Sequence, residues 1–137
     1  MNEFTVRQAA ALLGVSDDTV RRWGESGRLA MHTGASGRRT IAGADLVAVV
    51  REIAAGSALA EEFPTAKSSS RNKITGLVTR IQADGVMAQV DLQAGPFRVV
   101  ALLSREAVQD LALEVGMLAV ASVKATTVSI ELPAGEG

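Results

Sequence analysis

The sequence predicts two small domains: a mainly helical N-terminal domain with a short β-hairpin, and a C-terminal β-barrel with one short helix. Three observations support this. Apolar residues recur at helical spacing up to about residue 55. From residue 72 they alternate in short runs separated by turn residues, as in strands. Residues 56–67 between them are rich in small and polar side chains, which is typical of a linker. We therefore predict domains at 1–55 and 68–133.

The composition narrows the class of protein. With 47% hydrophobic residues the 137-residue chain can fold. Each of two such small domains would have a thin hydrophobic core, so we expect association with another copy to supply the missing burial. The chain has no Cys and one His, which argues against disulfides and against Cys- or His-based metal sites. No signal peptide or membrane span is predicted. We expect a cytoplasmic protein without an organic cofactor.

Two helices joined by a glycine turn are predicted at the N-terminus. Thr5 and Gln8 have the spacing of a capping box, and Gly14 ends the first helix. Ser16 then caps a second helix, which closes at Gly27. This order is typical of a helix-turn-helix.

A β-hairpin and a third helix follow. Two β-prone pieces flank a turn at residues 33–37 that contains two glycines, which favours a hairpin. A helix over residues 43–53 would then bury Leu46, Val49, Val50 and Ile53. The net charge of −1 does not indicate nucleic-acid binding, but all six cations in residues 1–50 are Arg, and four form adjacent pairs. Arg pairs also occur on ordinary solvated surfaces. Arginines that cluster in a domain of nearly neutral net charge nevertheless fit contact with phosphates.

Residues 4–16, 19–23 and 26–29 resemble the MerR-type and excisionase-like winged helix-turn-helix. The resemblance implies a double-stranded DNA partner, with the second helix in the major groove and the hairpin, or wing, on the backbone. The long dimerising helix of typical MerR-type members is missing, so dimerisation would come from elsewhere, or the unit binds DNA as a monomer or an array. The DNA-binding candidates carried over by position are Ser16, Asp18, Thr19, Arg21 and Arg22 on the second helix, and Arg38 and Arg39 on the wing.

The C-terminal half has the pattern of a small OB-like barrel. Strands are predicted near residues 72–81, 86–92, 97–103, 118–124 and 127–132. Ser104 is the predicted N-cap of a short helix after the third strand.

Two polar stretches flank these strands. Residues 69–73 offer hydroxyls, a guanidinium and an amide, and residues 123–126 offer an ammonium, a hydroxyl and strand-end N–H groups. These are the donors that a small oxyanion needs. Taken alone, the first stretch is explained by the polarity of a linker and the second by a charge on an edge strand. Their occurrence together in one domain favours an oxyanion-binding site.

Residues 69–72, 76–78, 103–108 and 123–128 resemble a Mop unit, also called the TOBE or molbindin fold. The resemblance implies a molybdate or tungstate site at subunit interfaces and a homo-oligomer formed through this domain. Ala107 stands where some members have a second hydroxyl, which would remove one donor if the site used it. By position, Ser69, Arg71 and Asn72 would come from one chain, and the site would be completed, in part by the neighbour, by Ser104, Lys124, Ala125 (through its N–H) and Thr126.

Together these features predict a molybdate- or tungstate-responsive transcriptional regulator. Two alternatives stay open: a molybdate storage or buffering protein, and an excisionase-like DNA-binding protein whose barrel only mediates assembly. An enzyme is not expected, because the sequence has no evident nucleophile–base pair, metal-ligand cluster or phosphate-binding glycine loop.

Overall fold

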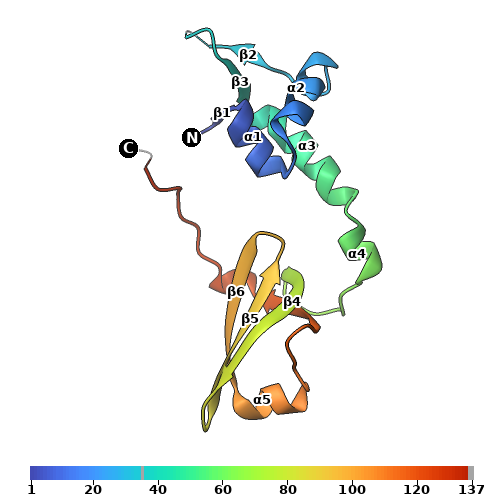
Figure 1. The fold of residues 1–137 in the computed structure, drawn as a ribbon, viewed down its shortest axis with the longest axis vertical. Helices are drawn as coiled ribbons and strands as arrows, with labels where there is room; N and C mark the ends of the chain where they lie inside the picture. Colours follow the sequence, from blue (N-terminus) through green and yellow to red (C-terminus); the bar gives the residue numbers. More distant parts are fainter. Residues whose placement is uncertain (35, 136–137) are drawn as a thin grey trace. The chain divides into compact units, whose positions relative to one another are not determined.

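The computed structural model describes residues 1–34 and 36–135, so Ala35 of the predicted wing turn lies outside the described residues. The chain divides into two compact units, one built on Met1–Ala58 and the other formed by Leu59–Leu132. The first is mainly helical, and the second is a curled antiparallel sheet with a short helix, which confirms the predicted fold class (Figure 1).

The first unit is a helix-turn-helix followed by a hairpin and a third helix. Its elements are β1 (Glu3–Thr5), α1 (Val6–Leu13), α2 (Asp17–Glu25), β2 (His32–Thr33), β3 (Arg39–Ala42) and α3 (Gly43–Ala55). Strand β3 lies between β1 and β2, antiparallel to both. The predicted caps are present: Thr5 and Gln8 form a capping box, Gly14 adopts φ 70°, and Ser16 accepts a hydrogen bond from the Thr19 N–H.

Helices and hairpin share one aliphatic core. Val20, Leu29 and Ile41 are its largest fully buried side chains, and Trp23 packs at its edge. The prediction for α3 is correct for Leu46 and Val49, which are buried. It is wrong for Val50 and Ile53, which are 45% and 36% exposed. The reason is that the rest of the unit covers only one narrow side of α3.

The second unit is a four-stranded antiparallel sheet. It contains β4 (Asn72–Ala83), β5 (Met87–Ala94), β6 (Phe97–Ser104), α5 (Arg105–Asp110) and β7 (Leu118–Val123), in the sheet order β6-β5-β4-β7. Val78, Val90 and Leu92 are the fully buried apolar cluster, and Val99 and Leu103 are among the half-buried side chains around it. Helix α4 (Ala58–Glu62) forms within the segment that the sequence marks as a linker.

The last predicted strand, 127–132, is wrong for the single chain. A 3₁₀ turn, η1 (Ala125–Thr127), follows β7, and residues 128–132 pair with no strand among the described residues. Val128, Ile130 and Leu132 are 46%, 89% and 86% exposed. A strand forms only where a neighbouring backbone accepts and donates its hydrogen bonds, and the described part of the chain places no such neighbour beside this segment.

Gly76 is required by a close approach between strands. A Cβ at this position would lie 2.5 Å from the carbonyl oxygen of Gln93 and 2.9 Å from its carbonyl carbon. We expect Gly76→Ala to lower the free energy of unfolding of the second unit by about 1–3 kcal/mol, because the backbone of β5 must move. Gly85→Ala is the matched control, since nothing lies within 4 Å of the added Cβ. Equal denaturant midpoints for the two variants would contradict this close approach.

Asp91 is a buried carboxylate on β5, 5% exposed. Gln89 Nε2 donates to Asp91 Oδ1 at 3.0 Å, and Arg98 donates two hydrogen bonds to Oδ2 at 3.0 and 2.8 Å. The hydrogen bonds from Gln89 and then Arg98 lower the pKa of Asp91. Stability from this carboxylate is therefore present above the ordinary aspartate pKa and is lost as the pH falls through the lowered one.

We expect Asp91→Asn to lower the Tm at neutral pH and to flatten the fall of Tm on acidification to about pH 3. Thermal unfolding followed by circular dichroism across this range measures both effects. Asp110→Asn, on the exposed end of α5, serves as the control. An acid profile of Asp91→Asn that matches the unsubstituted protein would show that Asp91 does not contribute to the pH dependence.

Candidate functional site

The first turn of α2 is held by its own side chains. Ser16 Oγ accepts from the Thr19 N–H at 3.1 Å and lies 2.9 Å from Thr19 Oγ1. Asp18 Oδ1 accepts from Arg21 Nη1 at 3.3 Å, in an ion pair that is largely exposed. The two hydroxyls therefore fix the helix start, while Asp18, Arg21 and Arg22 extend into solvent.

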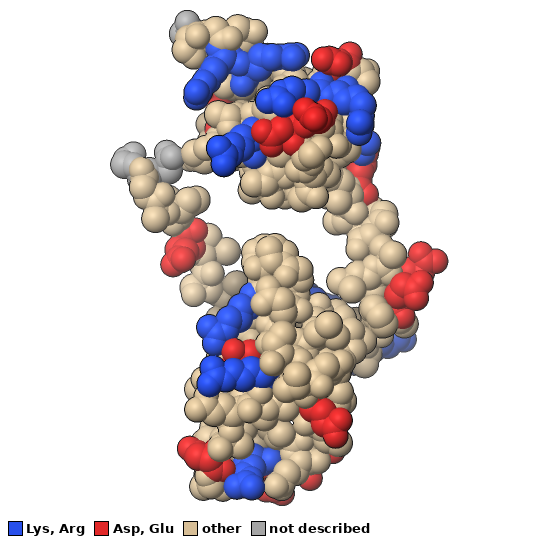
Figure 2. Space-filling model, viewed as in Figure 1, with Lys and Arg blue, Asp and Glu red and all other residues tan. Residues whose placement is uncertain are grey.

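A hollow of about 430 Å³ joins the start of α1, the start of α2 and the wing. Its lining includes Arg21, Arg38 and Arg39, so the structure brings together three of the predicted DNA-binding arginines. Arg22 is exposed but does not line it. Figure 2 shows basic side chains gathered on the drawn face of this unit, with carboxylates lying among them.

Arg7 lines the same hollow and was missed by the sequence reasoning. It follows the Thr5 cap, and β1 pairs with β3 at Thr5↔Thr40, which brings the start of α1 beside the wing. Only this long-range strand pairing makes Arg7 a neighbour of Arg38 and Arg39. The sequence did offer a weak signal for Arg7: it is a cation in the first turn of a predicted helix, in a domain that also carries an Arg pair on its wing.

We expect Arg7→Ala to weaken duplex binding to the same degree for all DNA sequences, because a phosphate contact carries no sequence information. The slope of log K against log salt should become shallower by about 1. Fluorescence anisotropy on two unrelated duplexes at several salt concentrations measures both quantities. A loss confined to one duplex would instead indicate base contact by Arg7.

Most predicted oxyanion residues meet at one end of the sheet in the second unit. Asn72 opens β4 and pairs with Val123 at the end of β7, and its Nδ2 donates to the Val123 carbonyl at 3.1 Å. Residues 69–72 therefore enter the sheet at the same end at which residues 124–126 leave it. The N–H groups of Ala125 and Thr126 open η1, and the first N–H groups of a helical turn have no acceptor within it.

The charges at this end suit an anion. Arg71 and Lys124 are exposed, and neither forms an ion pair within the described residues. Lys73 Nζ donates to the carbonyl of Ala66 and ties the preceding segment to β4. The hydroxyl of Ser70 is buried and has no hydrogen-bond partner in the described part of the chain. A buried hydroxyl without a partner is costly, so this end of the sheet fits the gain of a polar ligand or a further chain.

Ser104 lies elsewhere. It ends β6 opposite Met87, next to the Ala83↔Ala88 pair at the far end of β4. Because β4 has 12 residues, this end is roughly 35–40 Å from Asn72 along the strand. Ser104 Oγ also caps α5, accepting from the Ala107 N–H at 3.0 Å, which leaves its proton free to donate. One chain alone therefore does not bring Ser104 to the other predicted donors.

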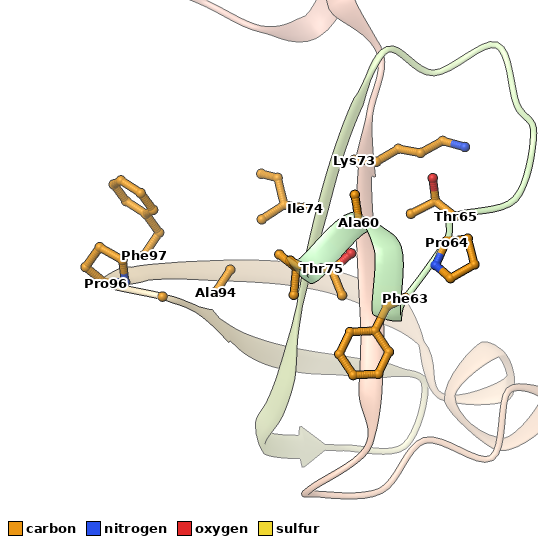
Figure 3. A pocket seen from close by; sticks show the side chains of 12 residues that line it. Ala60, Phe63, Pro64, Thr65, Lys73, Ile74, Thr75, Ala94, Pro96 and Phe97 are labelled. Atoms are coloured by element: carbon orange, nitrogen blue, oxygen red, sulfur yellow. The ribbon is translucent and has the colours of Figure 1, made fainter. Parts of the chain in front are cut away.

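A separate apolar groove of about 680 Å³ lies between α4, β4 and the β5–β6 turn. Its lining includes Phe63, Ile74 and Phe97, with Lys73 as the only charged side chain (Figure 3). One ammonium at the rim of an apolar wall offers too few donors to hold a multiply charged oxyanion. This groove is therefore not the predicted site.

The described structure was also searched for metal sites and membrane spans. Residues 1–34 and 36–135 contain no group of three or more His, Cys, Asp or Glu side chains arranged to hold a metal ion. In the same residues, no helix has the length and apolar character needed to cross a membrane.

Comparisons with known proteins agree with the division into two units. Residues 3–53 match the family model of a helix-turn-helix domain, and residues 68–130 match that of the TOBE domain. Both models describe binding domains rather than enzymes. No match was found among curated proteins.

Three solved structures are similar to part of this chain. A molybdate-binding protein from Sporomusa ovata is 33% identical over 49% of this chain and 100% of its own, with a TM-score of 0.48. MopII from Clostridium pasteurianum is 31% identical over 48% and 100%, with a TM-score of 0.46. The cytoplasmic molybdate-binding protein ModG is 34% identical over 44% and 43%, with a TM-score of 0.42. The chain thus carries a helix-turn-helix domain and, through residues 68–130, belongs to the TOBE domain family.

Proposed function

We propose that this protein is a DNA-binding transcriptional regulator that responds to molybdate or tungstate. One observation carries the proposal: a single chain joins a helix-turn-helix unit with an arginine-lined hollow to a TOBE unit in which the predicted oxyanion donors other than Ser104 belong to segments that adjoin at one end of the sheet. The Sporomusa ovata relative of that unit is a molybdate-binding protein. The domains would comprise residues 1–55 and 68–133, joined by residues 56–67.

In this proposal a tetrahedral dianion lies against residues 69–72 and 124–126. Arg71 and Lys124 supply charge, the hydroxyls of Ser69 and Thr126 and the amide of Asn72 donate, and the Ala125 N–H completes one side. Ser104 donates from a second copy of the chain, because it lies at the other end of its own sheet. The working protein is then a cytoplasmic homo-oligomer assembled through the C-terminal unit.

On the DNA side, α2 enters the major groove with Asp18, Arg21 and Arg22 facing the bases and backbone. Ser16 and Thr19 shape its first turn, and Arg38 and Arg39 hold the wing on phosphates. This placement follows the MerR-type arrangement. Anion binding changes how the copies assemble and so changes operator affinity, by a coupling free energy of about 1–3 kcal/mol, the usual range for such linkage.

The test has two stages. Calorimetric titration with molybdate, with sulfate as control, should show selective binding at a defined stoichiometry. Duplexes selected from a random library by the purified protein should then bind with an affinity that molybdate changes. Selective anion binding without sequence-specific DNA binding would instead favour storage. Specific DNA binding by a protein that ignores molybdate would favour an excisionase-like role.

A further inference from the structure

The segment that joins the two units in the sequence forms one wall of the apolar groove. Residues 58–68, here called the strap, comprise α4 and the extended piece after it, and from Leu59 onward they belong to the second unit. The strap contributes Phe63 and Pro64 to the groove, while β4 and the β5–β6 turn form the opposite wall. Figure 3 shows the side chains of both walls. The strap is therefore a structured part of the second unit.

The two walls carry apolar side chains that are still open to solvent. Leu59 and Phe63 on the strap are 49% and 43% exposed, and Ile74 and Phe97 on the sheet are 37% and 69% exposed. Packing of these side chains against one another would remove apolar surface from water, which is favourable. The loss of backbone freedom in the strap opposes this packing. Whatever orders the strap therefore shifts the balance toward closure of the groove.

The C-terminal end of the strap is tied to the proposed anion donors. Lys73 Nζ donates to the carbonyl of Ala66, and the Ser70 N–H donates to Ser68 Oγ at 3.2 Å. Residues 69–72, which carry three of the proposed donors, follow the strap without a break. The hydroxyl of Ser70 is buried and has no partner among the described residues. A ligand that orders residues 69–72 therefore also orders the end of the strap.

We propose that an oxyanion bound at residues 69–72 closes the strap over the apolar groove. The bound anion fixes the C-terminal end of the strap, so α4 loses less backbone entropy when it packs on the sheet. Phe63 then lies against the apolar wall that Ile74 and Phe97 provide. This inference rests on the proposed function, because its ligand is the anion of that site.

Closure also acts on the helix-turn-helix unit through the chain itself. Helix α3 ends at Ala55 and α4 begins at Ala58, so only Gly56 and Ser57 separate the two helices. When α4 is fixed on the sheet, the free connection between the two units is reduced to these few residues. A shorter connection allows fewer relative orientations of the units that it joins. The strap thus gives the anion site a route to DNA affinity.

Thiol labelling of the full chain measures closure, because the chain has no native Cys. Ala60→Cys places a thiol in the lining of the groove, and Ala48→Cys places one on an exposed position of α3. Saturating molybdate should slow the reaction of Ala60→Cys with a maleimide by about 5-fold or more, the lower bound of ordinary coupling. The rate for Ala48→Cys should not change, and sulfate should slow neither.

A second substitution tests the role of the groove. Phe63→Ser, added to Ala60→Cys, should abolish the slowing by molybdate, while calorimetry still detects molybdate binding because Phe63 is not a proposed donor. Leu111→Ser is the control, since Leu111 is a 62% exposed apolar residue outside the groove, and it should preserve the slowing.

The outcomes separate the strap from the proposed function. Molybdate binding with an unchanged labelling rate of Ala60→Cys would overturn the strap alone. Slowing that survives Phe63→Ser, or that Leu111→Ser abolishes equally, would do the same. No calorimetric binding of molybdate by the unsubstituted protein would overturn both the strap and the proposed function.

Discussion

Replacing Lys124 or Arg71 with alanine is expected to weaken molybdate binding by about 10- to 150-fold, the value of one charge-assisted hydrogen bond. Both cations are exposed and form no ion pair in the described structure, so their charge is available to a ligand. Both flank the Asn72–Val123 contact that joins the two halves of the proposed site. Isothermal titration calorimetry with each variant measures the loss.

The control for this prediction is Arg80→Ala. Arg80 lies on the same strand as Asn72, is exposed, and donates to Gln82 rather than toward the proposed site. Its removal changes the net charge of the unit by the same amount as Arg71→Ala. Equal losses of affinity in all three variants would mean that only overall charge matters. Unchanged affinity in Lys124→Ala and Arg71→Ala would remove the proposed site altogether.

Arg21→Ala is expected to weaken operator binding by about 5- to 150-fold while molybdate affinity stays the same. Arg21 lines the hollow between α2 and the wing, and its ion pair with Asp18 is exposed and therefore weak. The guanidinium can leave Asp18 for a phosphate or a guanine at little cost. Anisotropy with the selected operator, and calorimetry with molybdate, measure the two affinities.

Arg51→Ala is the matched control, because Arg51 is an exposed arginine on α3 that does not line the hollow. It should bind operator as the unsubstituted protein does. The comparison of specific and random duplexes separates two roles of Arg21: equal losses on both indicate phosphate contact, and a larger loss on the operator indicates base contact. Full operator affinity in Arg21→Ala would show that α2 is not the recognition helix.

Features set by neighbouring residues could be predicted from the sequence. The caps at Thr5, Ser16 and Ser104 each depend on a hydrogen bond to the residue three positions on, and all three form. The four strands β4 to β7 likewise follow the alternation of their own side chains. The two-domain fold class follows from these local signals, because the hydrophobic periodicity and the helix caps depend only on residues that are close together in the sequence.

The burial of α3 shows where this reasoning stops. Its apolar stripe is correct as a helix pattern, but Val50 and Ile53 remain exposed because no element within residues 1–34 and 36–135 covers them fully. Arg7 shows the same limit for function: its place beside Arg38 and Arg39 comes from the pairing of β1 with β3. Such neighbours are decided by contacts between distant segments, which periodicity does not encode.

The sequence by itself determined that residues 69–72 and 124–126 carry oxyanion donors and that Ser104 caps a helix, since donor chemistry and capping are local properties. Only the tertiary structure decided that the first two groups meet while Ser104 lies at the opposite end of the sheet, because antiparallel pairing sets which strand ends are neighbours. Likewise, residues 128–132 have the alternation of a strand, but whether a strand forms depends on a hydrogen-bonding partner that the single chain does not supply.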